Sequence, residues 1–154
     1  ALKQAGKVAF FGVSNFTPSQ FSLLNSYTPL VTNQIEASIT QLAPFNDGTL
    51  DQCIQHQIRP MAWSPFGGGS LFKPSDDPGM EQIRKVAASL AEKYGIQMDQ
   101  LLLAWLLKHP SKIVPVLGTS KLERVATAKA ALEVDLSRED WYRLLEASMG
   151  HEVA

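Results

Sequence analysis

The chain has 154 residues, of which 45% are hydrophobic and 19% charged, and this composition is typical of one globular domain rather than a disordered segment. The formal net charge is −1 with both signs spread along the chain, which argues against the one-sided basic surface that nucleic-acid binding requires. The single cysteine, Cys53, excludes an internal disulfide and a thiolate metal cluster, and we expect it to be a small core residue in a reducing cytoplasm.

The first third of the chain predicts two strands separated by a helix. Ala1 to Gly6 resembles the end of a helix that starts upstream, and Lys7 to Val13 is rich in β-branched and aromatic residues, which indicates a buried strand. Thr17 as N-cap and Pro18 at the first helical position predict a helix start. Leu30 to Ile35 is the second predicted strand.

The middle third predicts two helices around a third strand. A helix is expected from about Asp47 to Gln57, followed by a strand over Ile58 to Trp63. The glycine-rich segment Gly67 to Ser70 predicts a loop. Apolar residues between Ile83 and Tyr94 recur at helical spacing, and Gly95 is expected to end that helix.

The next segment predicts a buried helix and a fourth strand. Asp99 is the expected cap of a helix from Gln100 to Lys108, which is apolar on all sides and therefore buried on most of them. The apolar run Leu101 to Leu107 is far shorter than a membrane span, so we expect no membrane partner. Ile113 to Leu117 is the fourth predicted strand.

Two capping-box patterns predict the last two helices. Ser120 with Glu123 predicts the start of a helix that continues through Leu132. Ser137 with Asp140 predicts the start of the final helix.

The four predicted strands are separated by long helical crossovers, which favours parallel pairing in an α/β fold. This pattern fits both an open doubly wound sheet and part of a barrel, and ligand sites lie at the carboxyl ends of the strands in both. Any one polar residue after a strand has an even chance of being a plain loop residue. Polar residues follow all four strands, however, which favours a ligand site; they are Ser14, Asn15, Asn33, Gln34, Glu36, Ser64, Thr119 and Ser120.

The fourth strand end predicts a phosphate site. Gly118 to Ser120 leads directly into a helix, whose free N–H groups and dipole favour an anion. Lys121 and Arg124 follow in its first turn, where cations are unfavourable unless an anion lies between them. A solvated surface pair is the alternative. The glycines from Gly67 to Gly69 could let a pyrophosphate approach the backbone, although such a run more often marks a flexible loop.

Five motifs, in order and at compatible spacing, resemble the aldo-keto reductase family and in particular its bacterial oxidoreductase branch. The motifs are FGVSNF (11–16), VTNQIE (31–36), RPMAWSPFGGG (59–69), LLLAWLLKHP (101–110) and VLGTSKLERV (116–125), and the similarity covers nearly the whole chain. The resemblance implies that residues 1–154 are a single partial domain, the C-terminal half of a (β/α)8 TIM barrel with the family's fifth to eighth strands. It also implies that NADP(H) lies across the strand ends.

Carried over by motif, the resemblance assigns cofactor contacts along the dinucleotide. The nicotinamide carboxamide would be bound by Ser14, Asn15 and Gln34, and its ring would stack on Trp63, for which a core role is the alternative. The pyrophosphate would lie against Ser64, Phe66 and Gly68. The adenosine 2′-phosphate would be held by Thr119, Ser120, Lys121 and Arg124, which favours NADP over NAD.

The sequence departs from the family pattern at two places. Ala37 stands where many members have a tyrosine, and this difference concerns the top of the barrel or the substrate wall. Thr127 and Ala128 replace the acidic or amide residue and the asparagine that often contact adenine, which suggests weaker adenine contacts.

The family's catalytic Asp, Tyr, Lys and His belong to the first four strands, which this sequence does not contain. Core or surface roles are expected for the tyrosines and histidines that it does contain, which are Tyr27, Tyr94, Tyr142, His56, His109 and His151. No catalytic residue and no metal ligand is therefore assigned. A barrel of this type needs about 250 residues, so the chain cannot close one.

Three hypotheses follow for the function of the chain. It is a piece of an NADPH-dependent reductase of aldehydes or ketones, inactive without the N-terminal half; or it is a half-barrel that pairs with a second copy as a nucleotide-binding or scaffold module; or it is an unrelated α/β interaction domain.

Overall fold

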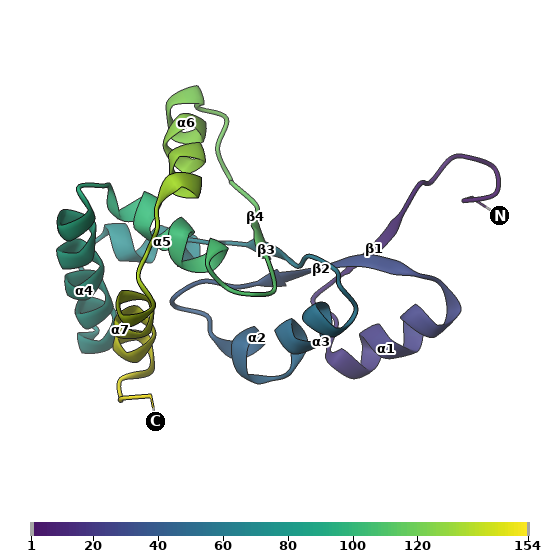
Figure 1. Cartoon of the computed structure of the whole chain (residues 1–154), viewed down its shortest axis with the longest axis horizontal. Helices are drawn as coiled ribbons and strands as arrows, with labels where there is room; N and C mark the ends of the chain where they lie inside the picture. The colour runs from purple at the N-terminus through teal and green to yellow at the C-terminus, as the bar shows by residue number, and fades with distance from the viewer. Residues whose placement is uncertain (1, 154) are drawn as a thin grey trace.

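The computed structural model describes residues 2–153, which form one four-stranded parallel sheet with helices around it (Figure 1). The strands pair in chain order, and they are β1 (Phe11–Ser14), β2 (Leu30–Glu36), β3 (Met61–Trp63) and β4 (Val114–Pro115). The helices are α1 (Pro18–Tyr27), α2 (Ala43–Asn46), α3 (Thr49–Gln55), α4 (Pro78–Tyr94), α5 (Met98–Leu107), α6 (Leu122–Ala130) and α7 (Arg138–Met149), with 3₁₀ turns η1 (Gly67–Phe72) and η2 (Ala131–Glu133). The predicted order of strands and their parallel pairing are confirmed.

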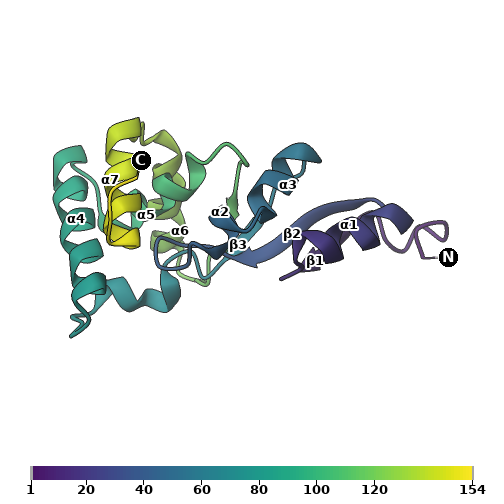
Figure 2. The same ribbon diagram turned by 90° about the horizontal axis from the view of Figure 1, so that it is seen from below.

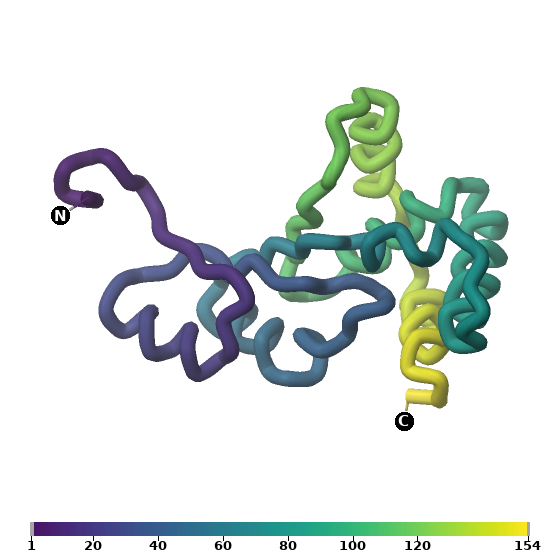
Figure 3. The backbone as a smooth tube through the Cα atoms, turned by 180° about the vertical axis from the view of Figure 1, so that it is seen from behind, coloured from purple at the N-terminus to yellow at the C-terminus, as the bar shows by residue number. Residues whose placement is uncertain are grey.

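β2 begins at the predicted Leu30 and extends one residue further, to Glu36. The other three strands are shorter than predicted, because a strand requires a paired neighbour and not only suitable residues. β1 begins at Phe11 instead of Lys7, since the residues before it extend beyond the sheet (Figure 3). Phe10 is 70% exposed there. β4 covers two residues instead of five, although flanking bonds from Val114 N to Pro60 O (2.9 Å) and from Val116 N to Ala62 O (2.8 Å) keep it beside β3.

Several helix ends follow the predicted capping. Thr17 caps α1, with Pro18 in its first turn, and Gly95 ends α4 in the left-handed conformation. Ser137 caps α7, where its hydroxyl accepts from Asp140 N at 3.1 Å. Local side chain to backbone bonds of this kind need no tertiary contact, which explains why the sequence indicates them.

Two predicted N-caps are wrong. At α5 a different residue is the N-cap, and at α6 no side chain forms a capping hydrogen bond. Gln97 precedes α5 and donates its N–H to the Gln100 side chain at 2.8 Å, while Asp99 lies inside the first turn. Lys121, not Ser120, precedes α6, and no side chain caps that helix. α6 also ends at Ala130, before the 3₁₀ turn η2, and the short helix α2 was not predicted.

The N-terminal segment has the geometry that closes a helix. Lys7 N donates to Leu2 O and Gly6 N donates to Lys3 O, both at 3.1 Å, and Gly6 has a positive φ of 67°. These two bonds around a left-handed glycine form a Schellman motif, the usual end of an α-helix. The prediction that this segment resembles a helix end is consistent with this turn.

The main core lies at one end of the molecule, where α4, α5 and α7 pack together (Figure 2). Trp105 of α5 is fully buried and stacks on Trp141 of α7 with ring centroids 5.2 Å apart. Each indole N–H donates to the other tryptophan's carbonyl oxygen, at 3.1 and 2.9 Å.

No helix within residues 2–153 is long and apolar enough to cross a membrane.

Helices α1, α2 and α3 lie together on one side of the sheet (Figure 1). The burial of side chains along β2 differs between the two faces of the sheet. Leu30 and Ile35 are buried, whereas Gln34 and Glu36 are only half-buried. Because successive strand residues point to opposite faces, Gln34 and Glu36 share the less covered face. Ser14 pairs with Gln34 and Trp63 with Glu36, so this face carries those strand ends. Asn33 is buried instead, where its amide donates to Phe16 O at 2.8 Å.

Candidate functional site

The ends of β1 and β2 are joined by short polar contacts. Ser14 pairs with Gln34 in the parallel register, and the Ser14 hydroxyl donates to the Gln34 carbonyl oxygen at 3.0 Å. Asn15 N donates to the same carbonyl at 2.8 Å, and Asn15 has a positive φ of 55°. Asn15 is therefore held in a left-handed turn at the end of its strand, a conformation that asparagine tolerates better than most residues.

Trp63 connects the end of β3 to the same row of residues. It pairs with Glu36 in the register of β2 and β3, and its indole N–H donates to Asn15 Oδ1 at 3.0 Å. Its neighbour Ser64 also has a positive φ, of 50°. The structure thus brings Ser14, Asn15 and Trp63 to one edge of the sheet.

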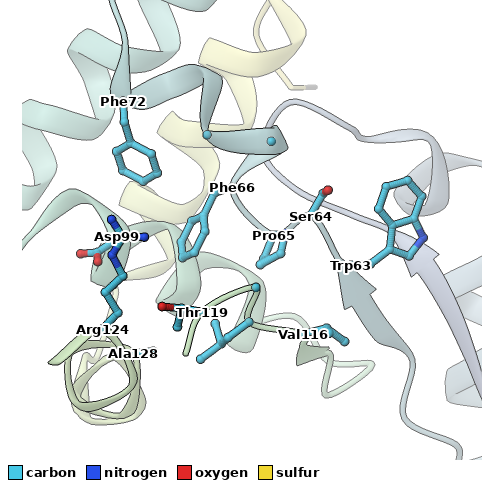
Figure 4. A pocket seen from close by; sticks show the side chains of 14 residues that line it. Trp63, Ser64, Pro65, Phe66, Phe72, Asp99, Val116, Thr119, Arg124 and Ala128 are labelled. Carbon is cyan, nitrogen blue, oxygen red and sulfur yellow. The ribbon is translucent and has the colours of Figure 1, made fainter. Parts of the chain in front are cut away.

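A pocket of about 700 Å³ continues from Trp63 toward α6 (Figure 4). Its lining comes from the end of β3, η1, α5, the segment after β4, and α6. The lining residues are Trp63, Ser64, Pro65, Phe66, Gly68, Gly69, Phe72, Asp99, Val116, Leu117, Gly118, Thr119, Arg124 and Ala128. A pocket of this volume is within the range of small-molecule and cofactor sites.

The glycine segment forms a tight turn at the pocket wall, where the sequence predicted only a loop. Gly67, Gly68 and Gly69 all have positive φ. A Cβ on Gly67 would collide with Thr40 Oγ1, whereas a Cβ on Gly68 would meet nothing within 4 Å. The turn therefore requires glycine for its conformation, and it leaves open backbone beside the pocket at Gly68.

The opposite wall combines a helix start with a cation. Arg124 lines the pocket from the first turn of α6 and forms no ion pair with any residue in 2–153. No side chain caps α6, so the backbone N–H groups of its first turn lack a capping partner. Thr119 also lines the pocket and accepts from Lys121 N at 3.2 Å.

Six of the eleven residues predicted to bind the cofactor line this pocket: Trp63, Ser64, Phe66, Gly68, Thr119 and Arg124. Ser14, Asn15 and Gln34 lie beside it at the strand ends but not in its lining. Ser120 and Lys121 are exposed and also lie outside the lining. Both were predicted from their place at a helix start and from the family resemblance, and their contact with a cofactor stays a prediction.

The structure adds pocket residues that the sequence did not indicate as functional. Asp99 enters from α5 and Phe72 from the end of η1. Ala128, which the sequence had noted at a position that often contacts adenine in the family, also lines the pocket, one turn beyond Arg124 on α6. Asp99 was read only as a helix cap. No local pattern could have placed it in the pocket, because α5 reaches the pocket through tertiary packing.

None of the tyrosines and histidines lines the pocket, and several have contacts elsewhere. Tyr94 OH donates to Asp140 Oδ2 at 2.7 Å, and His109 Nδ1 lies 2.7 Å from Ser111 Oγ. His56 packs against Phe21. Within residues 2–153, no cluster of three or more His, Cys, Asp or Glu side chains could hold a metal.

Cys53 is a core residue, as predicted. It is 2% exposed, and burial raises the pKa of its thiol to about 11. A thiol with so high a pKa remains protonated at neutral pH and is a poor nucleophile.

The aldo/keto reductase family model matches residues 1–148. The chain belongs to this family. It is 45% identical to the 6-dehydroglucose reductase of Agrobacterium fabrum over its whole length, covering 51% of that protein. It is 30% identical to the NADPH-dependent alpha-keto amide reductase of Saccharomyces cerevisiae, with 98% of this chain and 47% of that protein covered.

A solved aldo-keto reductase has the same fold. The structure of a thermostable member, determined with the inhibitor epalrestat, matches with a TM-score of 0.83 and 25% identity, and covers 95% of this chain and 51% of that one. The chain therefore spans about half the length of the relatives it matches. The predicted family and the predicted α/β fold, with four parallel strands that correspond to half of such a barrel, are confirmed.

Proposed function

We propose that this chain is the NADP(H)-binding half of a reductase that acts on aldehydes or ketones. The observation that carries the proposal is the continuous row from the polar strand ends, through Trp63, to the pocket containing Gly68 and Arg124. A dinucleotide is a long ligand with an aromatic amide at one end and phosphates further along. The row offers matching groups in that order.

The nicotinamide end fits the edge formed by β1, β2 and β3. Ser14, Asn15 and Gln34 carry the hydroxyl and amide groups that can bind a carboxamide, and Trp63 offers an aromatic ring. When bound, NADPH supplies the hydride for carbonyl reduction. The role of these residues is to orient the ring and to keep one of its faces away from water.

The phosphate end fits the pocket between η1 and α6. Open backbone at Gly68, with Ser64 and Phe66 beside it, suits the pyrophosphate. Arg124 and Thr119 suit the 2′-phosphate, because a guanidinium binds a doubly charged phosphate strongly. Ser120 and Lys121 lie next to this wall and complete the proposed set, which favours NADP(H) over NAD(H).

The catalytic groups and the partner half are proposed to lie outside these 154 residues. No tyrosine or histidine lines the pocket, so we infer that the chain alone does not reduce carbonyl compounds. The expected partner is the N-terminal half of the barrel, which would also supply most of the wall around the carbonyl substrate. A second copy of the chain, forming a nucleotide-binding or scaffold module, is the alternative, since the sheet leaves a face and edges open. A cytoplasmic location is also proposed, supported by the buried free thiol of Cys53.

The test is a binding titration of the 154-residue chain with NADPH and NADH, followed by tryptophan fluorescence and calorimetry. We expect Arg124→Ala to weaken NADPH binding about tenfold or more, the loss typical of a charge-assisted hydrogen bond, and to change NADH binding little. Lys129→Ala, which removes an exposed cation at the end of the same helix, is the matched control. Equal NADPH affinity of the Arg124→Ala variant and the wild type would contradict the proposal.

A further inference from the structure

The pocket contains a carboxylate that a phosphate site does not explain. Asp99 lines the wall near Arg124 and Ala128, at the end remote from Trp63 (Figure 4). A carboxylate repels phosphate, so its position in a pocket proposed for a phosphorylated ligand calls for a different ligand group. Half-buried, Asp99 is also less free to turn into solvent than an exposed side chain.

Contacts within α5 use only one of the two carboxylate oxygens of Asp99. As an acidic residue in the first turn of α5, Asp99 interacts favourably with the helix dipole. Its Oδ1 accepts from Gln100 N at 2.9 Å. No ion pair or hydrogen bond with residues 2–153 uses Oδ2, so this oxygen is available as an acceptor.

The walls near Asp99 suit a flat aromatic ligand group. Phe66 and Phe72 both line the pocket, with ring centroids 5.6 Å apart and an angle of 64° between the rings. Aromatic side chains stack on nucleobases, and the small side chain of Ala128 leaves space on the α6 side. The sequence had suggested weak adenine contacts because residues 127 and 128 are Thr and Ala.

We propose that Asp99 recognises the 6-amino group of adenine, so that the base contact is supplied by α5 instead of α6. The inference rests on the proposed binding of NADP(H). The amino group is a hydrogen-bond donor and a carboxylate is an acceptor-only group, which makes the pair complementary. Arg124 then binds the 2′-phosphate while Asp99 binds the base, so the two opposite charges contact different parts of one ligand.

The experiment compares NADPH with its hypoxanthine analogue, in which a carbonyl oxygen replaces the 6-amino group. Calorimetric titrations of the wild-type chain should show tighter binding of NADPH, by about tenfold, because the carboxylate would face a second acceptor in the analogue. Asp99→Asn keeps the shape but offers an amide N–H. This variant should lose the preference for NADPH or reverse it.

The control is Asp76→Asn, which neutralises an exposed carboxylate outside the pocket and should keep the wild-type preference. Urea unfolding of each variant checks that Asp99→Asn remains folded, and Asp99→Ser gives a second variant without a carboxylate. If the wild type binds both dinucleotides equally, or if Asp99→Asn keeps the preference, the role of Asp99 is overturned while cofactor binding stands. If the wild type binds neither, both the proposed function and this inference fail.

Discussion

Asp140 is a buried carboxylate that links α7 to α4. The residue is 2% exposed, and its Oδ2 accepts from Lys93 Nζ at 2.6 Å, from Tyr94 OH at 2.7 Å and from Ser137 Oγ at 3.1 Å. Burial raises the pKa of Asp140, but these hydrogen bonds outweigh it and lower the pKa to about 2. The sequence predicted Asp140 only as part of a cap, and its contacts with α4 come from tertiary packing.

We expect Asp140→Asn to destabilise the chain by about 2 kcal/mol at pH 7, because it weakens several charge-assisted hydrogen bonds at a buried position. The pKa is lower in the folded than in the unfolded state, so the stabilising effect is full above the ordinary value near 4 and is lost as pH falls toward 2. Urea unfolding at pH 7, 4 and 2.5 measures this. A difference from wild type that stays constant across this range would contradict the assignment.

The paired tryptophans connect two helices in the core. Trp105 lies in the last turn of α5, where backbone carbonyls lack partners within the helix. The Trp141 indole donates to the Trp105 carbonyl at 2.9 Å and so satisfies one of them. The contact joins residues 36 positions apart, and helical periodicity alone cannot indicate it.

Trp141→Phe should lower the free energy of unfolding by about 1–3 kcal/mol, since it leaves the buried Trp105 carbonyl without this donor. Urea unfolding followed by far-UV circular dichroism measures the change. Tyr142→Phe is the control, because it alters an aromatic residue beside Trp141 whose hydroxyl makes no hydrogen bond within residues 2–153. A loss of stability in the control equal to that of Trp141→Phe would argue against the specific role of the indole.

The whole molecule exposes surface that parallel sheets normally cover. All-parallel sheets are usually buried on both faces, but here α1, α2 and α3 lie on one side of the sheet and the polar strand ends lie on the other (Figure 1). Large apolar side chains are exposed at both ends of the sheet, including Phe10 before β1 and Leu122 at the start of α6, which is 85% exposed. Phe10 lies beside the edge strand β1, and Leu122 follows the other edge strand β4.

We therefore expect the chain alone to show no detectable NADPH oxidation with a reactive aldehyde. A fusion to the N-terminal half of the Agrobacterium fabrum relative should restore oxidation, measured by the loss of NADPH absorbance, because it supplies the missing strands. The same fusion carrying Arg124→Ala should show a raised KM for NADPH. Turnover by the unfused chain would refute this view, and a stable dimer in sedimentation would support pairing with a second copy.

The sequence by itself determined the parts that depend on local patterns. Apolar runs and crossover lengths predicted four parallel strands in the right order, and Thr17 and Ser137 predicted two helix starts. The five motifs identified the family, and polar residues after each strand predicted an edge with ligand-binding groups. These features could be read because each depends on residues close together in the chain.

Only the tertiary structure decided which side chains share the pocket. It placed Asp99 and Phe72 in the lining, where the sequence had assigned neither a role in binding, and it left Ser120 and Lys121 outside the lining. The physical reason is that packing between helices and sheet, rather than residue spacing, sets where each helix lies and which way a side chain points. The contacts of Asp140 and the paired tryptophans have the same origin.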